Sequence, residues 1–172
     1  TPSGRGIIPE NHPLALGLVG LYRTRVGRRV YQDADLLISL GSRNEEFQTA
    51  AWRYFPEDAK FVQVDIDPFE VGRNWMPDVA VVGDVKLTLS DMISQIQVII
   101  PRRPLDEMPR VKGIIEAKEA FEREVEFECS DPSIPIKSKR IVHEANKVFG
   151  DGTVLVNENG SQDLWSYYHP YY

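Results

Sequence analysis

The most informative segment of the sequence is residues 61–68, which read Phe61-Val62-Gln63-Val64-Asp65-Ile66-Asp67-Pro68. A short run rich in β-branched residues, closed by acidic residues and a proline, is typical of a buried strand followed by a turn. Similar runs occupy residues 35–40, 79–82 and 153–156. Apolar residues three or four apart predict helices over residues 13–22, 45–54, 85–97, 113–128 and 138–149. This alternation predicts an α/β fold with a doubly wound parallel sheet whose strands are buried.

A proline-rich break at residues 101–109 divides the chain, because three prolines in nine residues forbid a continuous helix and favour an extended connector. We expect a first domain at residues 1–100 and a linker with a charged helix at 101–136. The start of a second α/β domain is expected at 137–172. The many charged residues of the helix at 113–128 predict a solvated surface.

The composition excludes several classes of protein. The chain has 172 residues, of which 42% are hydrophobic and 27% charged, as in an ordinary globular protein. A net charge of -6 without a basic patch argues against nucleic acid as a partner. The single cysteine, Cys129, cannot form an internal disulfide, and no apolar run is long enough to cross a bilayer. We expect a cytoplasmic protein that does not bind membranes.

Small and acidic residues follow each of the first three predicted strands, where ligands of parallel α/β sheets bind. Gly41-Ser42-Arg43 follows the first strand. The glycine lets the backbone approach a ligand, and the arginine suits a phosphate or a flat ring. The alternative is a turn before a helix with a surface arginine.

Two carboxylates, Asp65 and Asp67, stand at the exit of the second strand. One could accept hydrogen bonds from ribose hydroxyls, or Asp67 could cap a helical turn that starts at Pro68. Gly83 and Asp84 follow the third strand, and there a cap for the helix beginning at Val85 is slightly favoured. Taken together, the three exits predict a nucleotide crevice. The Gly-x-Gly-x-x-Gly fingerprint of ordinary dehydrogenases is missing.

Other motifs are better explained by structural roles than by catalysis or metal binding. Gly150-Asp151-Gly152 precedes a strand instead of following one, so we interpret it as a turn and not as a metal site. His143 stands beside Val142 and Ala145 on a helix and is expected to be structural. The tail at residues 165–172 is strongly aromatic, and we expect it to contact another domain or a second subunit.

In their order along the chain, several of these segments resemble the central domain of thiamine diphosphate-dependent enzymes of the acetolactate synthase-like family. The resemblance rests on the segments at 4–14, 33–38, 41–43, 64–72 and 83–86, and it resumes at 153–165 with Gly160-Ser161-Gln162-Asp163-Leu164-Trp165. It implies a Rossmann-like, sirtuin/DHS-like central domain that lacks its first strands, followed by the opening of the diphosphate-binding domain. The chain is therefore expected to be a fragment.

The resemblance also implies a function for the parent protein. Such an enzyme forms or cleaves a carbon-carbon bond next to a carbonyl of a 2-oxo acid or acyl substrate. It uses thiamine diphosphate and Mg2+ and works as a homodimer or homotetramer. The family's catalytic glutamate and magnesium motif lie in regions that this sequence does not include, so we expect no catalytic residue here and an inactive isolated chain.

The resemblance implies binding residues as well. Nucleotide candidates are Gly41, Arg43, Asp65, Asp67, Gly83 and Asp84, and residues near thiamine diphosphate are Gly160, Ser161 and Gln162. The central domain of relatives holds FAD, ADP or nothing. Arg23 stands where flavin-binding relatives carry a glycine-flanked histidine segment, so it could fill space that a flavin needs. The alternative to an enzyme is a standalone, non-catalytic module that binds an adenine nucleotide or serves assembly.

Overall fold

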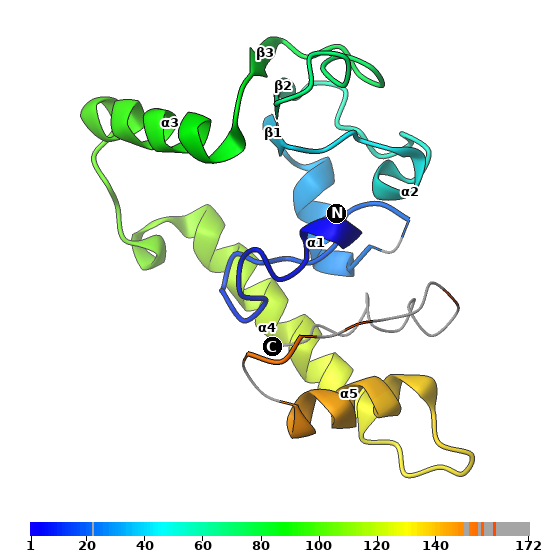
Figure 1. The fold of residues 1–172 in the computed structure, drawn as a ribbon. Helices are drawn as coiled ribbons and strands as arrows, with labels where there is room; N and C mark the ends of the chain where they lie inside the picture. Colours follow the sequence, from blue (N-terminus) through cyan, green and yellow to red (C-terminus); the bar gives the residue numbers. More distant parts are fainter. Residues whose placement is uncertain (22, 150–151, 155, 157–159, 161–172) are drawn as a thin grey trace.

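The computed structural model describes residues 1–21, 23–149, 152–154, 156 and 160. The strands are β1 (Leu36–Leu40), β2 (Lys60–Asp65) and β3 (Val79–Val82). The α-helices are α1 (Arg25–Gln32), α2 (Glu46–Thr49), α3 (Val85–Ile99), α4 (Pro109–Cys129) and α5 (Ser138–Val148), and the short 3₁₀ helices are η1 (Pro2–Gly4) and η2 (Leu105–Glu107). Figure 1 shows α1, α4 and α5 on one side of the strands and α3 beside them.

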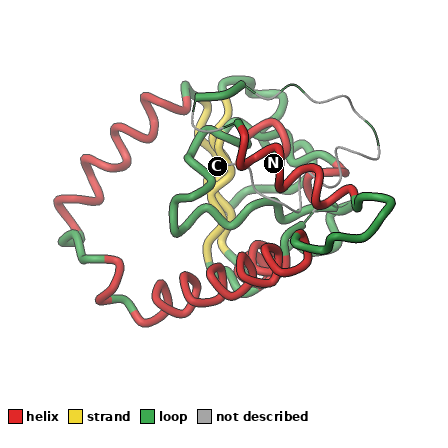
Figure 2. The backbone as a smooth tube through the Cα atoms, turned by 90° about the horizontal axis from the view of Figure 1, so that it is seen from below, coloured by secondary structure: helices red, strands yellow, loops and turns green. Residues whose placement is uncertain are grey.

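The sheet has three parallel strands in the order β1-β2-β3. Its register pairs Leu40 with Val64 and Asp65 with Val82, so the carboxyl ends of the strands meet at one edge. Figure 2 shows the strands running side by side, with α3 reaching away from them and α4 returning beneath. The predicted α/β class with a parallel sheet is confirmed.

The core is small and centres on β2, where Phe61 and Val64 are buried. Phe55, Phe61 and Trp75 pack together, with ring centroids 4.1 to 6.1 Å apart. The prediction that every strand is buried is wrong for β1 and β3. These strands form the two edges of the sheet, and alternate residues of β1 are partly exposed: Leu36, Ile38 and Leu40.

The helix predicted at residues 13–22 is absent from the described part of that segment, residues 13–21, which is extended or turned. Two glycines explain this difference. Gly17 has a φ of +79°, which a helix does not allow, and a Cβ at Gly20 would overlap the backbone of Gln48. The segment instead lies against the core, where Leu18 is buried and its carbonyl accepts a hydrogen bond from Thr24 N at 3.0 Å.

The helix predicted at residues 45–54 is shortened to α2. Three consecutive residues, Ala50, Ala51 and Trp52, have φ values of 53°, 56° and 59°. Left-handed backbone ends a right-handed helix. Local hydrogen bonds hold this turn, because Trp52 Nε1 donates to Asn44 O at 2.9 Å and Trp52 N donates to Thr49 Oγ1 at 3.1 Å.

The helices α3, α4 and α5 agree with their predicted positions, whereas α1 (Arg25–Gln32) was not predicted from the sequence. The proline-rich connector is extended apart from η2, and α4 begins at Pro109, where a proline fits the first helical turn. The surface of α4 is not wholly solvated as predicted, since Lys118 is buried. Its ammonium donates to Glu10 O at 2.8 Å and to His12 O at 2.7 Å, so it pairs with backbone carbonyls of the N-terminal segment.

The region after α5 does not contain the fourth predicted strand in its described part. Thr153, Val154 and Val156 are described and have no strand structure, while residue 155 lies outside the described residues. A parallel strand needs a hydrogen-bonded neighbour, and the described sheet consists of β1, β2 and β3. The division into domains at residues 100 and 136 stays a prediction. None of the described helices has the length and apolarity to span a membrane.

Candidate nucleotide site at the strand exits

The register of the sheet brings the predicted exit residues together. We call Gly41, Arg43, Asp65, Asp67, Gly83 and Asp84 the strand-exit site. Gly41 N donates to Val64 O at 2.8 Å, and Gly83 N donates to Asp65 O at 2.9 Å. These bonds extend the ladders of the sheet by one step on each side of β2. The exits of the three strands therefore form one continuous edge of backbone.

Gly41 turns the chain out of β1 with a φ of +56°, a conformation in which a side chain is strained. A Cβ built on it would lie 3.4 Å from Val85 Cγ2, at the first residue of α3. The exit of β1 is thus next to the N-terminus of α3. The N–H groups of a helix N-terminus favour negative charge, including phosphate.

One oxygen of each acidic residue in the site accepts a backbone hydrogen bond. Asp65 Oδ1 accepts from Asp67 N at 3.0 Å, and Asp67 Oδ1 accepts from Phe69 N at 2.9 Å. Asp84 Oδ1 accepts from Leu87 N at 2.9 Å and caps α3, as the sequence favoured. Asp67 also acts as a local cap, although a turn and not a helix follows it. These carboxylates shape the loops that carry them.

Arg43 extends from the exit of β1 towards acidic residues. Its Nη1 lies 3.3 Å from Glu45 Oε1, and its Nε lies 3.9 Å from Glu70 Oε1. The Arg43 side chain is 64% exposed, so these ion pairs are weak and the guanidinium can reach a ligand at the edge.

Gln63 holds the loops of this candidate site in place, a role that the sequence analysis missed. It is 2% exposed, its Nε2 donates to Glu70 O at 3.0 Å, and its Oε1 accepts from Gly72 N at 2.9 Å. The same Nε2 lies 3.5 Å from Ser42 O. One buried amide thus joins the loop after β1 to the loop after β2. Its signal in the sequence was a single uncharged polar residue inside an apolar strand.

Two further residues of these loops were also missed. Asn74 Nδ2 donates to Arg43 O at 2.7 Å, which fixes the backbone that carries the arginine. Glu70 Oε1 lies 2.8 Å from Arg73 Nη1. Its other oxygen, Oε2, is buried and has no hydrogen-bond partner among the described residues. A buried acceptor of this kind fits a hydroxyl or amino donor on a ligand.

Other candidate residues belong to α5 or to the region after it. His143 Nε2 is 2.9 Å from Glu126 Oε2 and joins α5 to α4, in agreement with a structural role. Gly160 is described and exposed, whereas Ser161, Gln162, Gly150, Asp151 and the aromatic tail lie outside the described residues. Among the residues that the structure describes, no group of three or more His, Cys, Asp or Glu could hold a metal ion.

Comparison with known proteins identifies the family of this chain. Residues 1–92 match the model of the family described as "Thiamine pyrophosphate enzyme, central domain". The chain is 34% identical to the probable acetolactate synthase large subunit of Methanococcus aeolicus, over 96% of this chain and 29% of the relative. It is 32% identical to the protein of that name from Methanocaldococcus jannaschii, over 96% of this chain and 28% of the relative.

A bacterial relative agrees with the archaeal ones. The chain is 27% identical to the acetolactate synthase isozyme 1 large subunit of Escherichia coli K12, over 94% of this chain and 27% of the relative. The chain thus spans less than a third of the length of these relatives.

Proposed function

The chain belongs to the thiamine pyrophosphate enzymes, and we therefore propose that it works within a longer acetolactate synthase-like subunit. In this proposal the whole protein forms or cleaves a carbon-carbon bond next to the carbonyl of a 2-oxo acid or acyl substrate. Thiamine diphosphate with Mg2+ supplies the nucleophilic carbon of that reaction. The names of the relatives support the substrate class. The longer subunit is supported by the length of these relatives, of which the chain spans less than a third.

Within that subunit, we propose that the strand-exit site binds the adenosine diphosphate portion of a nucleotide. The observation that carries this proposal is the continuous edge formed by Gly41, Asp65 and Gly83. The two glycines leave the backbone open to close approach, and the N–H groups in the first turn of α3 that Asp84 does not cap favour a phosphate beside Gly41. Arg43 supplies donors for the diphosphate, while a second oxygen of Asp65 or Asp67 and the buried Glu70 Oε2 are acceptors for ribose or adenine donors.

ADP suits the described residues better than FAD does. The Arg23 guanidinium carbon lies 4.8 Å from the centroid of the Tyr54 ring, so this side chain is packed on the protein surface by a cation–π contact. Arg28 lies 4.7 Å from the centroid of the same ring. Moving Arg23 to admit a flavin would break this stack. The proposal is therefore an adenine nucleotide that stabilises the domain and takes no part in the reaction.

We also propose cofactor-binding residues, an oligomeric state and a cellular compartment for this protein. Gly160, Ser161 and Gln162 contribute to thiamine diphosphate binding, as the resemblance implies. The protein is a homodimer or homotetramer, which the exposed apolar residues of β1 and α3 support. It functions in the cytoplasm, a compartment that suits a chain with one buried and reduced cysteine.

Calorimetric titration of the chain with ADP, and separately with FAD, tests the nucleotide site. Arg43→Ala should weaken ADP binding by about tenfold, because it removes a charge-assisted contact to phosphate. Arg73→Ala is the matched control: Arg73 also pairs with Glu70 and is 60% exposed, but it does not stand at a strand exit. It should change the affinity less than about twofold, which is within the range of a surface contact.

Two outcomes would refute the nucleotide site. One is a folded chain, verified by circular dichroism, that does not bind ADP or FAD at millimolar concentration. The other is an equal loss of affinity in both arginine variants, which would indicate a general effect of positive charge near Glu70.

A further inference from the structure

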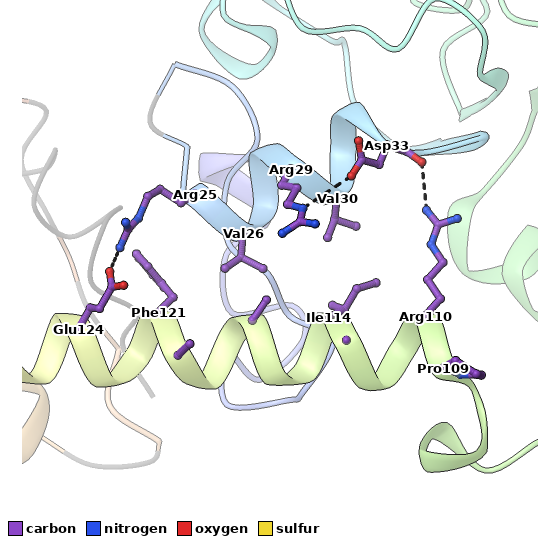
Figure 3. Close-up of a pocket in the computed structure, with 13 residues that line it drawn as sticks. Arg25, Val26, Arg29, Val30, Asp33, Pro109, Arg110, Ile114, Phe121 and Glu124 are labelled. Atoms are coloured by element: carbon purple, nitrogen blue, oxygen red, sulfur yellow. Dashed lines mark hydrogen bonds and ion pairs between the residues drawn. The ribbon is translucent and has the colours of Figure 1, made fainter.

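A groove of about 650 Å³ lies between α1 and α4, and none of its lining residues belongs to the strand-exit site. Its volume falls in the range of ~300 to 1,000 Å³ that is usual for small-molecule sites. Figure 3 shows α1 above and α4 below, with side chains of both helices pointing into the space between them. The interior is apolar and is formed by Val26, Val30, Ile114, Ala117 and Phe121.

Polar contacts brace the groove at both ends. Arg25 forms an ion pair with Glu124 at one end, and its guanidinium carbon lies 5.6 Å from the centroid of the Phe121 ring. At the other end, Arg110 Nη2 donates to Asp33 O at 3.1 Å. Figure 3 shows the apolar side chains between these two braces. The helices are thus held together at the ends and leave room in the middle.

The end of the groove near Asp33 carries excess positive charge. Two guanidiniums, those of Arg29 and Arg110, stand there against the single carboxylate of Asp33. Arg29 Nε is 3.8 Å from Asp33 Oδ2, and both side chains are largely exposed. Within the described part of the chain, Arg110 forms no ion pair. A guanidinium has five N–H donors, so Arg110 can accommodate an anion in addition to the Asp33 carbonyl.

Gly113 gives a further sign that the space is kept open. It lies inside the 21-residue helix α4 and lines the groove. A Cβ placed on it would meet no atom within 4 Å. Glycine in a helix interior is unfavourable relative to alanine, and no close contact requires it at this position. A larger side chain at residue 113 would fit without a clash and would occupy part of the groove.

From the apolar interior and the positive end, we propose that this groove binds a small organic anion with an apolar body and one terminal carboxylate. The body lies against Val30, Ile114 and Phe121, and the carboxylate binds Arg110 with help from Arg29. This site is separate from the nucleotide site, and the proposal does not depend on the identity of any nucleotide or substrate.

Titration of the isotope-labelled chain with octanoate, followed by amide chemical shifts, tests this proposal. Octanoate should shift amides of α1 and α4 around Val30 and Ile114. Octanol tests the apolar body without the charge and should bind at least about tenfold more weakly, since it lacks the charge-assisted contact. Acetate tests the charge without the body and should cause no shifts in this region.

Two variants localise the binding. Arg110→Gln should weaken octanoate binding by about tenfold and leave octanol binding unchanged. Gly113→Leu should abolish the binding of both, because the new side chain fills the groove, while helicity is kept or raised. Arg102→Gln is the matched control, since this exposed arginine belongs to the connector and does not line the groove.

The proposal is overturned if octanol binds as tightly as octanoate, or if Gly113→Leu binds octanoate unchanged. It is also overturned if the shifts map to the exposed residues of β1, such as Leu36 and Ile38, because binding would then be general adhesion to apolar surface. ADP binding is measured separately, so a failure here is distinguishable from a failure of the nucleotide site.

Discussion

At the scale of single residues, Gln63 explains why the loops at the strand exits keep their shape. Its buried amide donates to Glu70 O and accepts from Gly72 N, and it lies near Ser42 O. Buried polar groups are costly unless they are paired, so replacing this residue would leave backbone groups of two loops without partners. The strand-exit site therefore depends on a side chain that does not belong to it.

Replacing Gln63 by leucine should lower the free energy of unfolding by about 2 to 4 kcal/mol, the usual cost of leaving buried polar groups unpaired. Urea denaturation measures this difference. Gln97→Leu, an exposed change at the far end of α3, is the control and should stay within about 0.5 kcal/mol of the parent chain. Equal stability of the Gln63 variant and the parent chain would show that the buried amide bonds are not needed.

Residue roles were only partly predictable from the sequence. The cap formed by Asp84 was predictable, because an aspartate directly before a helical pattern bonds to nearby N–H groups. The partners of Gln63 and Lys118 were not, since they are carbonyl or amide groups of loops that the fold brings close. Lys118 shows this most clearly, as it contacts carbonyls more than a hundred positions away in the chain.

At the scale of elements, β2 was predictable from its apolar, β-branched run. Such a run suits a central strand, and Phe61 and Val64 of β2 are indeed buried. The helix predicted at 13–22 is not observed and the one predicted at 45–54 is shortened to α2, because helical spacing of apolar residues does not report backbone conformation. Gly17, with its positive φ, and the left-handed turn at residues 50–52 override that spacing. The contacts that these segments make with the core determine their conformation more strongly than the spacing of their apolar residues does.

The carboxylate of Asp78, just before β3, binds the first two residues of β2. Asp78 Oδ1 accepts from Lys60 Nζ at 2.7 Å, and Asp78 Oδ2 accepts from Phe61 N at 2.8 Å. The hydrogen bond from Lys60 and the one from the Phe61 amide hold the pKa of the Asp78 carboxyl below its usual value. A lowered pKa means that the ionised form stabilises the fold above the unfolded pKa of about 3.9 and that this contribution is lost below it.

Asp78→Asn should therefore be less stable than the parent chain at pH 7, and the difference should shrink as the pH falls through 4 towards 3. Urea denaturation at several pH values measures it. Asp58→Asn serves as the control, because Asp58 is exposed and forms no ion pair among the described residues. A difference in stability between Asp78→Asn and the parent chain that stays constant from pH 7 to pH 3 would show that the contribution of Asp78 to stability does not depend on its ionisation.

At the scale of the whole molecule, the chain exposes more apolar surface than a self-contained domain usually does. Ile38 on β1 is 43% exposed, and Ile93 and Ile99 on α3 are 53% and 75% exposed. The sequence predicted buried strands because it reports apolar character and not what covers it. These surfaces agree with a chain that packs against further protein, as the relatives of more than three times its length imply.

The subunit mass of the native protein, measured in its source cells with an antibody raised against this chain, distinguishes an enzyme subunit from a standalone binding module. Since the chain spans 29% and 28% of its archaeal relatives, we predict a subunit with roughly three and a half times the 19.6 kDa of this chain. That mass would support an acetolactate synthase-like enzyme with this chain as its central region. A native subunit of 19.6 kDa would contradict the enzyme and leave a standalone binding module.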